Sequence, residues 1–250
     1  MTPAEPDWSA YLAQFHAQRS GITEGLLGCA TDSRGRTPYS WLAEAVPMRG
    51  RVLDLACGSA PMAELLHGAQ YVGVDLSRAE LHLAAARGLP VAQADAARLP
   101  VAAADVDAVV CSMALQLLPL EPALAEVRRV MRPGGRFVAT VPVARPMPPR
   151  DALRWARLLV ALREPRLRYP NDDALARADE VVAAAGLTLV SDDAQGFGVD
   201  VVSQAAADQL LDGLYLPGAP GDRLAAARRV VRGWVGRRIT LPIRRLVACV

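Results

Sequence analysis

From Arg51 onward, short apolar runs alternate with segments of helical pattern. The apolar runs have the length of buried strands, and the segments between them have the apolar spacing of helices that pack on one face. This alternation is typical of a parallel sheet with crossover helices. The candidate strands are Arg51–Ala56, Tyr71–Asp75, Pro90–Ala94, Val106–Cys111 and Arg136–Val141.

The connecting helices have recognisable ends. They are predicted to begin with Pro61, Ser77 and Pro122, because proline suits a first helical turn and serine can cap one. The run Arg132-Pro133-Gly134-Gly135 is predicted to end the third helix, since proline cannot continue it and glycine accepts the backbone of a C-cap.

The 250 residues, 52% of them hydrophobic, suit one α/β domain. We expect a Rossmann-like, doubly wound, mostly parallel seven-stranded sheet with an antiparallel strand, an N-terminal helical cap and an inserted lid helix. The lid is predicted at Asp151–Arg163, over the crevice where such sheets bind ligands. The expected parts are a cap (1–50), a cofactor-binding core (51–142), a lid and helix (143–186) and a C-terminal part (187–250). The helix after the lid is predicted at Ala174–Ala185. The C-terminal part is predicted to contain a strand from Leu187, the helices Ser203–Leu214 and Gly221–Val235, and a final strand Ile239–Val250.

The segment Val52–Pro61 joins a buried strand to a turn of small residues and then to a helical pattern. Small residues are needed where the backbone touches a ligand. Asp75 ends the next strand, 21 residues after Asp54, where a carboxylate can accept both hydroxyls of a ribose. The pairing predicts a nucleoside site.

The turn itself discriminates between nucleoside cofactors. A dinucleotide site needs three glycines and free N–H groups for a pyrophosphate, whereas Ala56, Gly58 and Pro61 stand at those positions. S-adenosylmethionine (SAM) has no phosphate, and its methionine carboxylate can use the positive end of a helix. The residues therefore favour SAM.

These motifs resemble those of class I SAM-dependent methyltransferases, in the small-molecule branch and similar to methyltransferase type 11, over about residues 51–142. The resemblance extends to Ser112–Pro119 and Val127–Phe137. It implies that Asp75 holds the ribose, that Asp54 organises the site, and that S-adenosyl-L-homocysteine is the product. The other cofactor-binding residues that it implies are Ala56, Cys57, Gly58, Leu76, Asp95, Ala96 and Ser112.

One departure from the family concerns Ala56 and Ala60, where glycine is usual. Each added methyl group is expected to crowd the methionine end of the site slightly, without abolishing binding.

Further candidates lie outside the core. His16, in the cap, is the candidate proton acceptor. Arg19 and Tyr39 are candidates for binding the methionine carboxylate. The candidate substrate residues are Gln116, Trp155, Phe197 and Tyr215.

Charge and cysteine usage exclude other classes. The net charge is +2 and the arginines are interleaved with acids, so no nucleic-acid partner is expected. The four cysteines are scattered singly, which indicates neither disulfides nor a metal site. No signal-peptide pattern in Met1–Asp7 and no run of about 20 apolar residues is found, so a cytoplasmic protein without a membrane partner is expected.

The sequence predicts methyl transfer from SAM to an O, N or C atom of a small organic molecule, for example in secondary metabolism. Two alternatives stay open: SAM could serve a non-methylating cyclisation or elimination, or the chain could be a SAM sensor without turnover, because fold and site similarity do not choose among these. The oligomeric state is not determined by the sequence.

Overall fold

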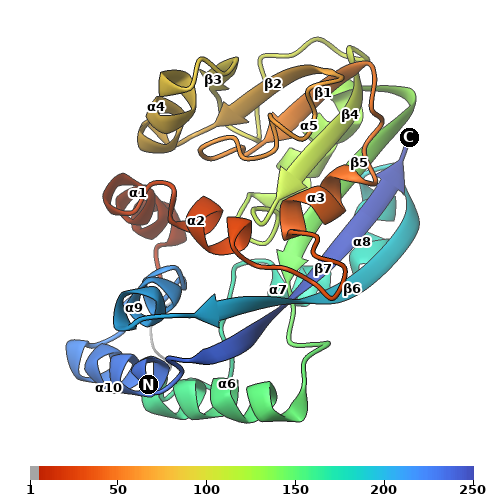
Figure 1. Ribbon diagram of the computed structural model, residues 1–250. Helices are drawn as coiled ribbons and strands as arrows, with labels where there is room; N and C mark the ends of the chain where they lie inside the picture. The colour runs from red at the N-terminus through yellow and green to blue at the C-terminus, as the bar shows by residue number, and fades with distance from the viewer. Residues whose placement is uncertain (1–5) are drawn as a thin grey trace.

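A computed structural model describes residues 6–250 of the chain, so most of the segment Met1–Asp7 lies outside the described residues. It contains the expected seven-stranded sheet, in the order β3-β2-β1-β4-β5-β7-β6 (Figure 1). All neighbouring strands are parallel except those paired with β7, which runs antiparallel to both β5 and β6. The strands are β1 (Arg51–Leu55), β2 (Gln70–Asp75), β3 (Val91–Gln93), β4 (Val106–Ser112), β5 (Met131–Pro142), β6 (Thr188–Val201) and β7 (Arg237–Cys249).

Ten helices accompany the strands in the described part of the chain. They are α1 (Trp8–Gln18), α2 (Ile22–Gly28), α3 (Pro38–Ala43), α4 (Arg78–Ala86), α5 (Leu120–Val130), α6 (Pro149–Leu162), α7 (Asp172–Leu175), α8 (Ala178–Ala184), α9 (Gln204–Asp212) and α10 (Gly221–Arg232). The predicted start of α4 is confirmed, because the Ser77 side chain accepts the N–H of Glu80.

The sheet is covered on both faces, which explains why β1 and β4 are buried along most of their length. On one face, Leu53 and Leu55 belong to a core shared with α5, α7 and α8. On the other face, Val52 belongs to a core shared with α3 and α4. The alternation of β1 side chains between these cores fixes the register of the strand, since a shift by one residue would exchange the two faces.

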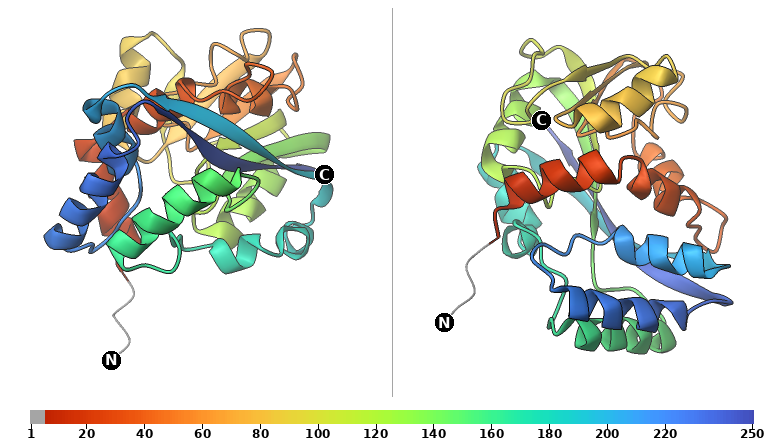
Figure 2. Two further views of the ribbon diagram at one scale, coloured as in Figure 1. Left: turned by 60° about the horizontal axis from the view of Figure 1, so that its bottom comes forward. Right: turned by 90° about the vertical axis from the view of Figure 1, so that its left-hand side faces the viewer.

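The predicted lid helix has a different position. Figure 2 shows α6 beside α10, near α9, at the end of the molecule where β6 and β7 extend beyond the other strands. Leu158 and Leu162 of α6 pack there with Ala227 and Val231 of α10. The apolar side of α6 is therefore satisfied by a third core, and the helix does not lie over the ligand crevice.

Two local predictions are wrong. Residues 61–68 form successive turns with separate backbone bonds, such as Ala63 N–H to the Ala60 carbonyl, instead of a continuous helix that begins at Pro61. The expected helix Ala174–Ala185 is two short helices, α7 and α8. The predicted end of the third helix is confirmed, since α5 ends at Val130, but Pro133-Gly134-Gly135 lies within β5, at an irregularity of its pairing with β4, and does not form the C-cap.

Within residues 6–250, no helix is both long and apolar enough to cross a membrane.

Candidate functional site

A cavity of about 900 Å³ lies at the carboxyl ends of β1, β2 and β4. The strand order reverses between β1 and β4, which is where open α/β sheets bind ligands. Helices α1 and α2 also line it, and Figure 1 and the right-hand view of Figure 2 show α1 between α4 and α9. The predicted site residues in the wall are His16, Tyr39, Asp54, Ala56, Cys57, Gly58, Asp75, Leu76, Asp95, Ala96, Ser112 and Tyr215.

Asp75 ends β2 at the edge of this cavity. Its Oδ2 accepts the N–H of Gly58 at 2.8 Å and its Oδ1 accepts the N–H of Ser77 at 2.7 Å. Burial raises the pKa of Asp75, and the two N–H donors oppose that rise. The carboxylate thus joins the turn after β1 to the start of α4, and its remaining lone pairs are available to ligand hydroxyls.

Asp54 lies deeper, at 1% exposure. Its Oδ2 accepts the Tyr71 hydroxyl at 2.7 Å. Its Oδ1 is buried without a hydrogen-bond partner in the described structure. Burial raises the pKa of Asp54 to about 7, and the Tyr71 bond opposes that rise. A buried, half-satisfied carboxyl group beside a cavity suits a cationic ligand.

The turn after β1 folds through left-handed backbone. Ala56, Gly58 and Ala60 have φ angles of 54°, 55° and 61°. A Cβ at Gly58 would meet only Glu80, at 3.8 Å, so the turn leaves open space there. The departure from glycine at Ala56 and Ala60 therefore imposes a conformational cost as well as the expected crowding, because side chains disfavour this region.

Replacing Ala56 with Gly is expected to raise the free energy of unfolding by up to about 1 kcal/mol, since relief of the left-handed backbone outweighs the added entropy of the unfolded chain. Chemical denaturation measures the change. The matched control is Ala139→Gly in extended β5, which should lower the same free energy by about 0.5–1 kcal/mol or more. A loss of stability for Ala56→Gly would show that its methyl group contributes more than the backbone costs.

Glu80 connects the cap to the core. It lies on α4 at 4% exposure, and its Oε1 is 3.0 Å from Nδ1 of His16 on α1. Its Oε2 accepts the N–H of Gly21, also at 3.0 Å. On the other side of the ring, Nε2 of His16 is 3.3 Å from the Tyr215 hydroxyl. These contacts place His16 in the cavity wall between a buried carboxylate and a phenol.

A second connection runs from the cap to the turn. The Ser59 hydroxyl donates to Glu24 on α2, and the Arg87 guanidinium donates to Glu24 at 3.2 Å and to the Ser59 carbonyl at 3.0 Å. These three side chains hold α2 against the turn after β1.

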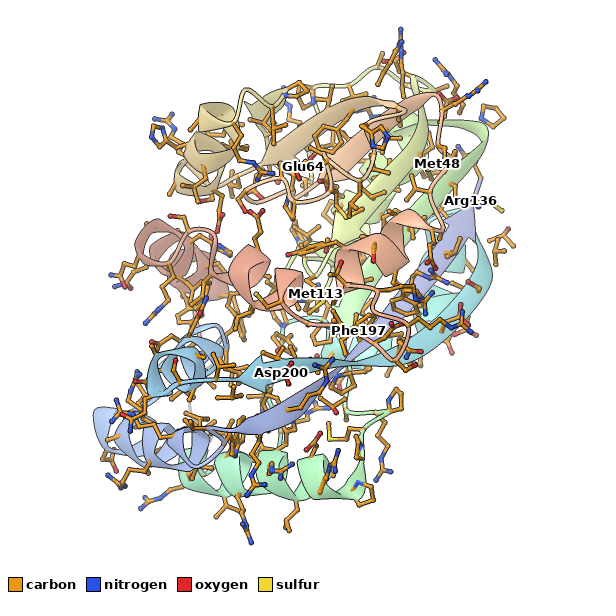
Figure 3. All side chains as sticks on the ribbon, in the orientation of Figure 1. Met48, Glu64, Met113, Arg136, Phe197 and Asp200 are labelled. Carbon is orange, nitrogen blue, oxygen red and sulfur yellow. The ribbon has the colours of Figure 1, made fainter. Side chains whose placement is uncertain are left out.

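Four predicted site residues are absent from the cavity wall. Arg19 stacks over the Phe15 ring at 5.1 Å, and Gln116 is buried with its Nε2 donating to the Met113 carbonyl. Trp155 donates to the Thr240 carbonyl and packs on Trp234, in the third core. Phe197, labelled on β6 in Figure 3, is fully buried against Trp41. Each aromatic ring packs in a core because its apolar area is better buried there than in an open cavity.

The wall also contains residues that were not predicted as site residues, among them Trp8, Glu24, Ser59, Glu80 and Met113. The spacing of Ser77 and Glu80 is that of a capping box, in which the glutamate bonds back to the serine N–H. In the structure Asp75 accepts that N–H, so the Glu80 carboxylate is free to bind the cap. Only the tertiary contact identifies Glu80.

The donor set fits SAM. The wall contains five carboxyl groups, from Glu24, Asp54, Asp75, Glu80 and Asp95, and one guanidinium, from Arg78. SAM carries a sulfonium and an ammonium group, which such a wall attracts, and Asp75 is placed for its ribose. A pyrophosphate would meet like charge instead.

Comparisons with known proteins agree with this geometry. Residues 53–139 match the family described as a methyltransferase domain. The malonyl-[acyl-carrier protein] O-methyltransferase of Alcanivorax borkumensis is 36% identical over 155 residues, 57% of this chain and 51% of that protein. The demethylmenaquinone methyltransferase of Mycolicibacterium paratuberculosis is 44% identical over 91 residues, 35% of this chain and 40% of that protein. The chain thus spans about half the length of these curated relatives.

Among solved structures, the [4+2]-cyclase SpnF superposes with a TM-score of 0.63 at 20% identity, covering 99% of this chain and 97% of the cyclase. At that identity the likeness concerns the fold.

The sheet order, the antiparallel β7 and the acid-rich cavity define an α/β protein with a ligand site at the carboxyl ends of its central strands. Residues 53–139, about a third of the chain, match the methyltransferase domain, and this segment includes the turn after β1 and Asp75.

Proposed function

We propose that the chain catalyses methyl transfer from SAM to an O, N or C atom of a small organic molecule. The observation that carries the proposal is the cavity at the strand ends, where Asp75 and the half-satisfied Asp54 face a wall rich in carboxylates. Bound SAM supplies an electrophilic methyl group. The chain's own residues bind both reactants, align them and exclude water, which accounts for much of the rate in such displacements.

A small acceptor suits the enclosure of the site. The cap helices α1 and α2 cover the cavity, and its volume of about 900 Å³ is in the range of sites for small ligands. Apolar side chains contribute to the wall from the cap and from the loop after β4, among them Trp8, Leu12, Met113 and Leu117. These residues are the proposed surface for the acceptor, together with Tyr215, whereas a nucleic acid or protein would need an open surface.

The sequence leaves two alternatives open, namely a non-methylating cyclisation or elimination and SAM sensing without turnover. The relatives named as methyltransferases are 36% and 44% identical, whereas the cyclase is 20% identical and supports the fold alone. The higher identity to the methyltransferases favours methyl transfer over the two alternatives.

The test combines binding with turnover. Calorimetry should show heat on adding SAM or S-adenosyl-L-homocysteine and none with NAD. Mass spectrometry of reactions with a panel of acceptors should then detect S-adenosyl-L-homocysteine that depends on one acceptor, together with a product heavier by one methyl group. A product formed from an acceptor while SAM keeps its methyl group would show a non-methylating reaction. Tight SAM binding without any product would show a SAM sensor.

A further inference from the structure

His16 lies in an arrangement that determines which ring nitrogen carries the proton. The Glu80 carboxylate accepts a hydrogen bond from Nδ1, 3.0 Å away, because an ionised carboxylate has no proton to donate. In the neutral ring the other nitrogen, Nε2, then has a free lone pair. The Tyr215 hydroxyl, 3.3 Å from Nε2, is placed to donate to it. Burial raises the pKa of Tyr215, so that its hydroxyl keeps the proton it donates.

The position of Glu80 is itself fixed. The side chain is nearly buried, and its second oxygen accepts the Gly21 N–H at 3.0 Å. Rotation of the carboxylate away from His16 would leave that N–H unpaired at the turn between α1 and α2, which costs free energy in a buried site. The ring of His16 is further held by Phe15, whose centroid is 5.3 Å away.

The cavity wall restricts the charge of a molecule that reaches Nε2. Its five carboxyl groups face one guanidinium, from Arg78, and the chain contains no lysine. An anionic acceptor would have no cation to pair with apart from Arg78, whose Nε already donates to Gln93 at 2.9 Å. A cationic acceptor would be repelled by the sulfonium of SAM at the short distance that methyl transfer requires. An uncharged acceptor meets neither penalty.

We propose that His16 is the proton acceptor in methyl transfer to an uncharged hydroxyl compound, a phenol or an enol, and that Glu80 is its positioning residue. The inference rests on the proposed function and deepens it. The acceptor hydroxyl replaces Tyr215 as the donor to Nε2. Its oxygen forms a bond to the methyl carbon as the carbon–sulfur bond breaks, with the electron pair going to sulfur. The hydroxyl proton passes to Nε2, and the resulting imidazolium is paired with Glu80.

The kinetic test uses neutral phenols of graded acidity and matched amines and carboxylates on the same ring frame. Wild-type protein should convert the phenols to methyl ethers. His16→Asn should lower kcat by on the order of 10²–10⁴-fold, the range typical of a lost general base. The rate of His16→Asn should rise as the phenol pKa falls, because the ionised fraction of the phenol then grows. The matched control His82→Asn, at an exposed position on α4, should retain wild-type kcat.

A second readout does not depend on turnover. Nitrogen-15 NMR of the protein without SAM should show His16 protonated at Nδ1 and unprotonated at Nε2 when the ring is neutral. Glu80→Gln should shift the proton toward Nε2 and lower kcat by about tenfold or more, while calorimetry checks that SAM still binds.

The results separate this inference from the proposed function. Methylation of amines or carboxylates only, a neutral His16 protonated at Nε2, or unchanged kcat in His16→Asn would overturn the inference and leave methyl transfer standing. Failure of wild-type protein to bind SAM would overturn the proposed function itself, and the inference with it.

Discussion

Replacing Asp75 with Ala is expected to weaken SAM binding by on the order of a hundredfold or more. Two ribose hydroxyls can donate to this carboxylate, and a hydrogen bond to a charged group contributes roughly 1.5–3 kcal/mol. Losing about 3 kcal/mol corresponds to more than a hundredfold in the dissociation constant. Asp75→Asn should weaken binding less, because one acceptor oxygen remains. Calorimetric titration of each variant with SAM gives the comparison.

The Asp75 variants should also be less stable without ligand. The carboxylate accepts the N–H groups of Gly58 and Ser77, so its removal leaves both donors without that acceptor. We expect Asp75→Ala to lower the free energy of unfolding by about 1–3 kcal/mol. Asp173→Ala, at an exposed position on α7, is the control and should be nearly neutral in both assays. Normal SAM affinity in a destabilised Asp75→Ala would make Asp75 a purely structural residue.

The second large effect concerns pH and Asp54. Its pKa is about 7 in the folded protein, against 3.8 for the free side chain. Below about pH 4 the group is protonated in both states, and between pH 4 and 7 the unfolded chain ionises while the folded protein stays protonated. Unfolding then releases a proton, so the free energy of unfolding should fall as the pH rises through this interval, by about 4 kcal/mol from this group.

Asp54→Asn should remove this contribution, and denaturant titrations from pH 4 to 8 measure the difference between the two proteins. Tyr71→Phe provides a second variant. It removes the hydrogen bond that favours the ionised form, so the decrease in stability should extend to higher pH. Parallel curves for wild type and Asp54→Asn would show that Asp54 is ionised in the folded protein throughout.

SAM binding should respond to pH in the opposite direction. A cationic ligand beside Asp54 favours the ionised carboxylate, so SAM should bind more tightly at pH 8 than at pH 5.5. Asp54→Asn should lack the part of that dependence that arises from this group. If SAM affinity changes equally with pH in wild type and Asp54→Asn, the pH dependence arises from other titratable groups of the cavity wall.

The sequence by itself determined the strands of the parallel part of the sheet and the location of the turn after β1. Buried parallel strands are continuous apolar runs, so the five predicted segments all correspond to strands of the structure. Asp54 and Asp75 follow from the same pattern, because residues at the carboxyl ends of neighbouring parallel strands must lie at one edge of the sheet.

Only the tertiary structure decided which other side chains reach the cavity. Periodicity shows that α6 has an apolar side but not what covers it, and the extended ends of β6 and β7 give it a core of its own. His16 and Glu80 are 64 residues apart, so no local spacing indicates their contact. The left-handed backbone at Ala56 and Ala60 is likewise not predicted by alanine, because alanine disfavours that conformation. Contacts between distant segments are set by packing, which the local pattern of residues does not encode.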